Sequence, residues 1–156
     1  MIAINIVCVG TLKEKYWVSA IEEYSKRLKL FCNFKIIEVK ESLEGKNENE
    51  ILKQKNLESK LLEKYKSDYN IALEINGQQL SSTEFAKKIE DITIKGCSSI
   101  SFFIGGSNGL DKQFSDSLDY KISFGKITYP HQLMRIILTE QIYRAFMILN
   151  NRSYHK

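Results

Sequence analysis

Short apolar segments rich in Ile, Val and Phe alternate with longer amphipathic segments along most of the chain. The short segments predict strands at 2–9, 34–39, 69–75, 100–104 and 120–124. The amphipathic segments predict helices between Gly10 and residue 28, at 48–65, 83–93 and 112–117, and from Pro130 to residue 149. This alternation predicts the α/β class, with a mostly parallel sheet that carries helices on both faces.

Three local signals indicate where these elements begin and end. Asn76-Gly77 after the third strand predicts a tight turn. Ser81 and Ser82, with Glu84 in the turn that follows, predict a capped helix start. Pro130 is expected in the first turn of the last helix, where a missing N–H removes no helical hydrogen bond.

The final helix differs from the others because apolar side chains surround almost its whole circumference between residues 133 and 149. Its polar positions form one narrow stripe, made of Arg135, Thr139, Glu140 and Arg144. A helix of this kind must be covered on most sides. Cover from a second copy would make the protein a homodimer, and the alternative is a central core helix within one chain.

The composition fits one globular domain over residues 1–156. A chain of this length can bury enough surface to need neither disulfides nor a structural metal. Cys8, Cys32 and Cys97 are an odd number of distant cysteines, which favours buried thiols in a reducing compartment. Because no signal peptide or membrane-length apolar run is found, we expect a cytoplasmic protein with no membrane partner.

Positive charge is concentrated in the last fifth of the chain. Residues 1–123 hold 18 basic and 18 acidic side chains, whereas residues 124–156 hold five basic ones and Glu140 as the single acid. The basic residues are Lys126, Arg135, Arg144, Arg152 and Lys156, and both histidines, His131 and His155, lie in the same segment. A local basic region in an otherwise neutral protein is typical of nucleic-acid binding, and the alternative is a solvated surface without a partner.

A glycine-rich segment, residues 105–109 with the sequence GGSNG, follows the fourth predicted strand. It matches neither the dinucleotide-binding glycine pattern nor a P-loop, which disfavours nicotinamide and nucleoside-triphosphate chemistry. Adjacent glycines let a ligand approach the main chain closely, and the alternative is a tight turn that only the fold requires. Ligands of parallel sheets bind where the carboxyl ends of strands converge, here at 73–76, 105–109 and 124–129.

Other catalytic patterns are weak in this sequence. No Ser-His-Asp order stands out, and neither histidine has a partner at metal-ligand spacing, so we expect neither nucleophilic catalysis nor a metal site. The C-terminal segment combines cations, an aromatic ring and a titratable ring in Arg152, Tyr154, His155 and Lys156. This set suits phosphate contact and base stacking, and the alternative is a frayed tail.

Four ordered motifs carry a resemblance over the full length of the chain. They are the glycine segment 105–109, TYPHQLMR at 128–135, EQIYRA at 140–145 and the terminal YHK at 154–156. With Val9-Gly10 and the segment 73–77 they make the chain similar to the RlmH family. That family consists of SPOUT-class methyltransferases that act on N3 of a pseudouridine in large-subunit rRNA.

The resemblance implies an α/β fold with a C-terminal trefoil knot over about residues 98–156, and a homodimer. It also implies S-adenosylmethionine as the cofactor, held in a bent shape by main-chain atoms of the knot loops. Those loops correspond here to Leu73, Gly105, Phe124, Gly125, Lys126, Ile127, Thr128 and Tyr129. Serine is common in the family at the position of Gly125, so a hydroxyl contact is lost there while main-chain recognition is expected to persist.

The implied reaction is methylation of N3 of pseudouridine 1915, in helix 69 of 23S rRNA within assembled ribosomes, and no DNA partner is expected. The N3 imide titrates about two pH units above neutrality, so forming its anion costs about 2.7 kcal/mol and requires a base or a nearby cation. The alternatives are a non-catalytic ribosome- or RNA-binding protein and a SPOUT methyltransferase that acts on another RNA.

The resemblance also suggests roles for the C-terminal side chains. We expect His155 to be the general base and Tyr154 to stack on a base, with Arg144 beside them in the catalytic site. The residues expected to contact RNA are Arg135, Arg152, Lys156 and His131. For His131 the alternative is a ring that bonds to the main chain at the helix start.

Overall fold

The computed structural model describes residues 1–156, in which five strands alternate with five helices. The strands are β1 (Ala3–Val9), β2 (Asn33–Val39), β3 (Tyr69–Gln79), β4 (Ser99–Ile104) and β5 (Tyr120–Ser123). The helices are α1 (Lys15–Leu28), α2 (Glu48–Glu63), α3 (Ser82–Ile94), α4 (Lys112–Asp116) and α5 (His131–Leu149). Each predicted element is present, with ends that shift by a few residues.

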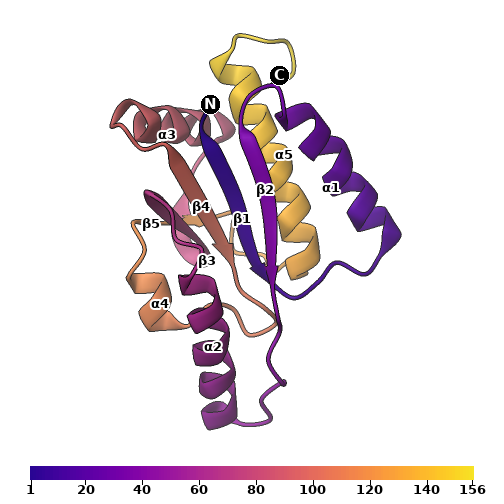
Figure 1. Ribbon diagram of the computed structural model, residues 1–156, viewed down its shortest axis with the longest axis vertical. Coiled ribbons are helices and arrows are strands. Elements are labelled where there is room, and N and C mark those ends of the chain that lie inside the picture. Colours follow the sequence, from indigo (N-terminus) through magenta and orange to yellow (C-terminus); the bar gives the residue numbers. More distant parts are fainter.

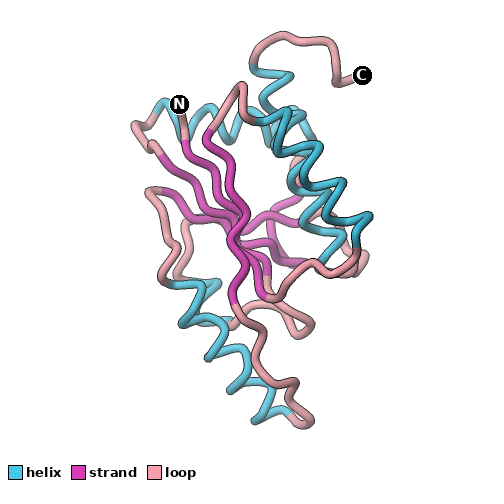
Figure 2. Tube along the Cα trace, turned by 45° about the vertical axis from the view of Figure 1, so that its right-hand side comes forward, coloured by secondary structure: helices cyan, strands magenta, loops and turns pink.

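All five strands pair in parallel in the order β2-β1-β4-β3-β5. Helices α1, α3 and α5 pack on one face, and α2 and α4 on the other (Figure 1). The sheet between these two layers is strongly twisted (Figure 2). The predicted α/β class is therefore confirmed, whereas the trefoil knot stays a prediction. None of the helices is both long enough and apolar enough to cross a membrane.

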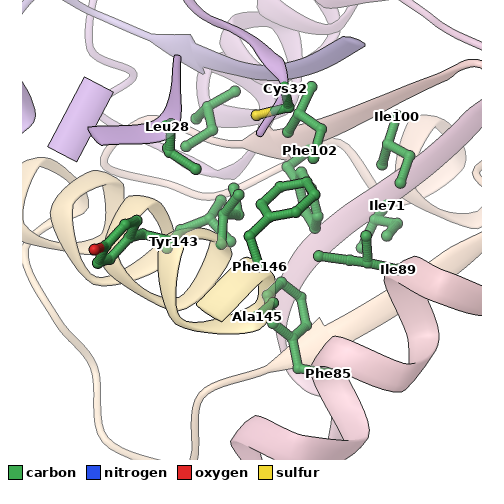
Figure 3. Packing of buried hydrophobic residues seen from close by; sticks show 14 of the residues in the cluster. Leu28, Cys32, Ile71, Phe85, Ile89, Ile100, Phe102, Tyr143, Ala145 and Phe146 are labelled. Carbon is green, nitrogen blue, oxygen red and sulfur yellow. The ribbon is translucent and has the colours of Figure 1, made fainter. Parts of the chain in front are cut away.

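The central strands bury side chains on both faces, which explains why their sequences are apolar almost without interruption. Ile4, Ile6 and Cys8 of β1 point to the larger cluster, whereas Val7 and Val9 point to the smaller one. In the larger cluster α5 packs on the sheet together with α1 and α3, as Figure 3 shows for its labelled residues. All three cysteines are free thiols, but Cys8 and Cys32 are buried as predicted whereas Cys97 is only half-buried. Burial raises the pKa of Cys8 and of Cys32 to about 12.

The prediction that Asn76-Gly77 ends the third strand is wrong. Strand β3 continues to Gln79, and both Leu73 and Gln78 pair with Ile122, so residues 74–77 bulge out of the ladder. A Cβ atom on Gly77 would lie 2.6 Å from the carbonyl carbon of Ile122. The glycine is therefore needed for a close approach of two main chains rather than for a turn.

The start of α1 also differs from the prediction. The helix begins at Lys15, and Leu12 lies in the preceding loop, where its N–H donates to Glu38 Oε2 at 2.8 Å. The apolar pattern after Gly10 predicts Tyr16 on the buried face of this helix, but Tyr16 is 63% exposed. In contrast, the predicted start of α3 is confirmed by a capping box, in which Ser81 and Glu84 each bond to the other's main-chain N–H.

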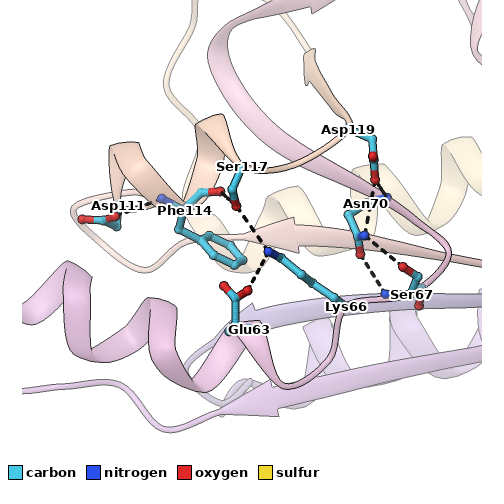
Figure 4. A network of polar contacts seen from close by, with 8 residues as sticks. All are labelled: Glu63, Lys66, Ser67, Asn70, Asp111, Phe114, Ser117 and Asp119. Atoms are coloured by element: carbon cyan, nitrogen blue, oxygen red, sulfur yellow. Dashed lines mark hydrogen bonds and ion pairs between the residues drawn. The ribbon is translucent and has the colours of Figure 1, made fainter.

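A polar network fixes the amino ends of β3 and β5 (Figure 4). The Asn70 side chain accepts from Ser67 N–H at 2.8 Å, and Asn70 N–H donates to Asp119 Oδ2 at 2.7 Å. Nearby, Lys66 Nζ donates to Glu63 at 2.7 Å and lies 5.5 Å from the centre of the Phe114 ring. We call this end of the sheet the amino edge, and the opposite end the carboxyl edge.

Candidate functional site

A pocket lies at the carboxyl edge, between the ends of β3, β4 and β5 and the start of α5. The predicted cofactor-binding residues that line it are Leu73, Gly105, Phe124, Gly125, Ile127, Thr128 and Tyr129. Lys126 is exposed and does not belong to the lining. The structure therefore brings together three segments that are distant in sequence, and whether they hold a cofactor stays a prediction.

The glycine segment after β4 forms one wall of this pocket. Gly109 N–H donates to Gly106 O at 3.0 Å, and a Cβ atom on Gly105 would lie only 2.3 Å from the Gly109 carbonyl carbon. The segment is thus a tight turn that requires glycine at position 105. The same turn exposes main chain to the pocket, so the two alternatives left by the sequence do not exclude each other.

The turn after β5 also lines the pocket and leaves free space beside Gly125. The Ser123 hydroxyl accepts from Gly125 N–H at 3.1 Å, which fixes the turn, and Gly125 has a φ of +109°. A Cβ atom at Gly125 would meet no other atom within 4 Å. A side chain there would occupy space that is now free, and the left-handed backbone would be strained.

The chemistry of the lining limits what the pocket can bind. Most of its side chains are apolar, none is Lys or Arg, and Glu74 is the only carboxylate. A phosphate group would find no cation here, whereas a purine ring finds apolar walls and a sulfonium finds a negative charge. The residues present therefore fit S-adenosylmethionine, and no side chain of the lining would neutralise a nucleotide phosphate.

His131 begins α5 and lines the pocket. Burial is the main cause that lowers its pKa, the Arg135 charge lowers it further, and Glu41 acts in the opposite direction. The imidazole is thus neutral at pH 7 and is able to accept a proton or a hydrogen bond. A neutral, partly buried imidazole of this kind differs from the cationic surface side chain that usually contacts an RNA phosphate.

Arg135, predicted to contact RNA, is completely buried instead. Its Nη2 atom donates to Val9 O at 2.8 Å and to Gly10 O at 2.9 Å, and its Nη1 atom donates to Glu38 at 2.9 Å. We therefore correct that prediction. The first half of the polar stripe on α5 points to the ends of β1 and β2, so Arg135 ties α5 to the loop after β1.

The predicted catalytic residues gather in a second place, which we call the tail cluster and which consists of Glu140, Arg144, Tyr154 and His155. Arg144 Nη2 and the Tyr154 hydroxyl donate to the same Glu140 oxygen at 2.6 and 3.0 Å. Arg144 Nη1 lies 3.3 Å from His155 Nδ1. Burial, followed by hydrogen bonds with Tyr24 and Glu140, raises the pKa of Tyr154, so its hydroxyl remains protonated.

The tail cluster and the pocket lie at opposite ends of α5. His131 lines the pocket, and Arg144 follows it by thirteen residues, which corresponds to about 20 Å along a helix axis. In Figure 1 the C-terminus lies near the amino ends of the strands, away from the pocket. The other two predicted RNA contacts lie with this tail, where Arg152 stacks 5.1 Å from the Phe31 ring and Lys156 is exposed.

The sequence reasoning did not find two buried polar residues on α2 that lie behind the glycine turn. Glu58 is 3% exposed and its carboxyl oxygens make no hydrogen bond of good geometry, while Gln54 Oε1 accepts from Asn108 at 3.1 Å. Burial and then the Glu41 charge raise the pKa of Glu58, and weaker contacts with the Gln54 side chain and the Ser42 main chain act in the opposite direction. The spacing in the sequence could have indicated their burial. Gln54 and Glu58 precede Leu62 at intervals of four residues and therefore share its buried helix face.

Three comparisons relate the chain to known proteins. Residues 2–155 match a family model described as "Predicted SPOUT methyltransferase". Two relatives, from Finegoldia magna and Streptococcus uberis, are named ribosomal RNA large subunit methyltransferase H. They are 52% and 48% identical, and each alignment covers 98% of this chain and 99% of the relative.

A solved structure described as "a probable methylase family protein from Haemophilus influenzae Rd KW20" superposes with a TM-score of 0.56. It is 13% identical, and the match covers 98% of this chain and 70% of that one. At this identity the likeness concerns the fold alone.

Proposed function

Since the chain belongs to the SPOUT methyltransferase family, within the group of the ribosomal RNA large subunit methyltransferases H, we propose that it methylates N3 of a pseudouridine in 23S rRNA. S-adenosylmethionine is the proposed methyl donor, and helix 69 of assembled ribosomes is the proposed target. The observation that carries the proposal is the carboxyl-edge pocket, whose glycine turns and cation-free walls suit this cofactor.

The pocket residues orient the donor and keep water away from it. When bound, S-adenosylmethionine supplies a methyl group on a sulfonium, which is ready for attack by a nitrogen nucleophile. The glycine turn at 105–109 and the turn at Gly125 let main-chain atoms approach the ligand, and the Glu74 carboxylate favours its positive charge. Alignment of donor and acceptor in this fixed space is the main contribution of the pocket.

The tail cluster supplies the chemistry that the acceptor needs. N3 must lose its proton, and we propose that His155 accepts it on Nδ1. Arg144 can only donate to this atom, so Nδ1 holds the free lone pair while Nε2 carries the hydrogen. Arg144, 3.3 Å from His155 Nδ1, is placed to stabilise the negative charge that develops on the carbonyl oxygens beside N3. Glu140 holds both Arg144 and Tyr154, so the three side chains keep a common geometry.

A second copy of the chain would complete the site. Pocket and tail cluster lie about 20 Å apart along α5, so one chain does not hold both halves. Helix α5 also keeps apolar side chains that are only half-buried, among them Ile136, Ile137 and Ile148. A homodimer that covers these side chains and brings the tail of one copy to the pocket of the other satisfies both observations.

The first test is methyl incorporation with identification of the product. We expect labelled S-adenosylmethionine to modify intact ribosomes more than free subunits, and mass spectrometry to identify 3-methylpseudouridine. Calorimetry with S-adenosylmethionine alone tests the pocket separately. A protein that binds ribosomes without binding the cofactor would be a non-catalytic binder, and methyl groups on transfer RNA would identify another substrate.

The second test is subunit mixing. Gly105→Ala disrupts the pocket and His155→Ala removes the proposed base, so each variant alone is expected to be inactive. Random exchange between the two should form one intact site in half of the dimers, which restores about a quarter of the parent activity. No recovery would contradict the shared site, and unchanged single-turnover methylation by His155→Ala would contradict the role of His155.

A further inference from the structure

Two aromatic side chains at the start of α1 contribute neither to the core nor to the pocket. Tyr16 is 63% exposed and Trp17 is half-buried, and their ring centres lie 4.8 Å apart in an edge-on arrangement. Neither residue belongs to, or packs against, the two hydrophobic clusters. Large aromatic rings at a protein surface provide flat faces on which nucleobases of any sequence can stack.

This aromatic pair lies on the same edge of the molecule as the pocket. Because the sheet is parallel, the loop after β1 leaves the carboxyl edge, as do the segments that line the pocket. Buried Arg135 holds the carbonyl groups of Val9 and Gly10, and Glu38 binds both Arg135 and Leu12 N–H. The loop that leads from the pocket side to Tyr16 is therefore fixed at three points.

The charges around the pair favour a polyanion. Lys13 and Lys15 lie beside the rings in the sequence, and both are exposed. The first turn of α1 contains no acidic residue, and Glu14 at the N-cap makes no capping hydrogen bond, so its single negative charge opposes only one of the two lysines. Aromatic faces next to cations match a nucleic acid strand, in which bases and phosphates alternate.

We infer that Lys13, Lys15, Tyr16 and Trp17 form a platform that binds unpaired nucleotides of the RNA substrate. Bases stack on the two rings while the lysines contact phosphates. The choice of RNA rests on the proposed function, in which a base must leave its stem-loop to reach the pocket and its neighbours become accessible. We call this surface the α1 platform.

The chain contains a single tryptophan, so its fluorescence reports directly on the α1 platform. The full-length protein is titrated with an RNA stem-loop of helix 69 sequence and with a blunt duplex of the same stem. We expect the stem-loop to quench the emission of Trp17, and the duplex and S-adenosylmethionine alone to leave it nearly unchanged.

Substitutions separate stacking from charge. Tyr16→Ala and Trp17→Ala are each expected to weaken stem-loop binding about tenfold, whereas Tyr16→Phe and Trp17→Phe retain it. Lys15→Gln should lower the slope of log affinity against log salt by about one. Tyr65→Ala is the matched control, because Tyr65 is 40% exposed in the turn after α2 and should not affect RNA binding.

The outcomes separate this inference from the proposed function. Parent-like RNA affinity of both alanine variants would overturn the α1 platform, and so would conversion of a dimeric parent into monomeric variants in sedimentation. The variants should bind S-adenosylmethionine as the parent does. Quenching by RNA in a protein that transfers no methyl group would support the platform while the proposed function fails.

Discussion

The two edges of the sheet differ in how well their acidic side chains are hydrogen-bonded. At the amino edge, the Asp68 carboxylate accepts from the N–H and hydroxyl of Ser98 and from Ser99 N–H, and these hydrogen bonds lower its pKa. At the carboxyl edge, Glu58 is buried without a well-formed hydrogen bond behind a turn made of glycines. Satisfied polar groups stabilise a fold, whereas a buried group without well-formed hydrogen bonds lowers its stability.

This difference indicates that the two ends of the strands have different roles. The amino edge fixes the register of β3, β4 and β5 through short polar side chains, while the carboxyl edge keeps free space where those strands end. Substitutions at the amino edge should therefore change stability more than ligand binding, and those at the carboxyl edge should affect both.

The largest effect is expected for Arg135→Ala, which removes the anchor of the loop after β1 at the carboxyl edge. The change leaves two buried carbonyl groups without their donor and removes one of the two donors of Glu38, so the free energy of unfolding should fall by about 3 kcal/mol. Urea denaturation measures this loss, with the exposed Arg152→Ala as the control. A loss no larger than that of the control would contradict the anchoring role.

A smaller loss is expected for Asn70→Ala at the amino edge. The substitution removes hydrogen bonds with Ser67 and Asp119 from a side chain that is 8% exposed, and should lower stability by about 2 kcal/mol. Calorimetric affinity for S-adenosylmethionine should not change. A parallel loss of cofactor affinity would show that the two edges are not independent.

Glu58→Gln should have the opposite sign and depend on pH. Burial raises the pKa of Glu58, so between the ordinary carboxyl pKa and the raised value the native state binds more protons than the unfolded state. Stability of the parent therefore falls as pH rises through that window. Unfolding at pH 8 should show the variant more stable by about 1 kcal/mol, and at pH 4 the difference should vanish. Equal stability of the two proteins at pH 8 would mean that Glu58 has partners in solution.

The smallest effect is expected for Lys66→Ala, on the outer rim of the amino edge. Its ion pair with Glu63 is partly exposed to solvent and its contacts with Ser117 and the Phe114 ring are long, so the loss should be about 0.5 kcal/mol and should decrease in high salt. Denaturation at two salt concentrations checks this. A loss of stability larger than that of Asn70→Ala would mean that ion pairs stabilise this edge more than buried hydrogen bonds do.

Much of the fold could be predicted from the sequence because local patterns determine it. Strands that are buried on both faces are almost continuously apolar, as in Ile100 to Ile104, and the capping box at Ser81 is a local signal. The convergence of Leu73, Gly105 and Phe124 at one pocket follows from the rule that ligands bind at carboxyl ends of parallel strands.

The remaining features depend on contacts between distant segments. The spacing on α5 groups Arg135 with Arg144, but the helix crosses the sheet, so Arg135 meets the end of β1 while Arg144 meets the tail. The Asn76-Gly77 pair predicts a turn, but Gly77 packs against the main chain of Ile122 and the strand continues beyond it. Neither outcome has a signal within a few residues in the sequence.

The bond between Arg135 and the loop after β1 also sets the order in which the protein can mature during its synthesis. Val9 and Gly10 are among the first residues made, and the guanidinium that anchors them belongs to Arg135, which follows them by 126 and 125 positions. The growing chain can form early strand pairs, but that loop stays unanchored until α5 has left the exit tunnel. The enzyme therefore acquires its finished pocket only after translation of its own message is essentially complete.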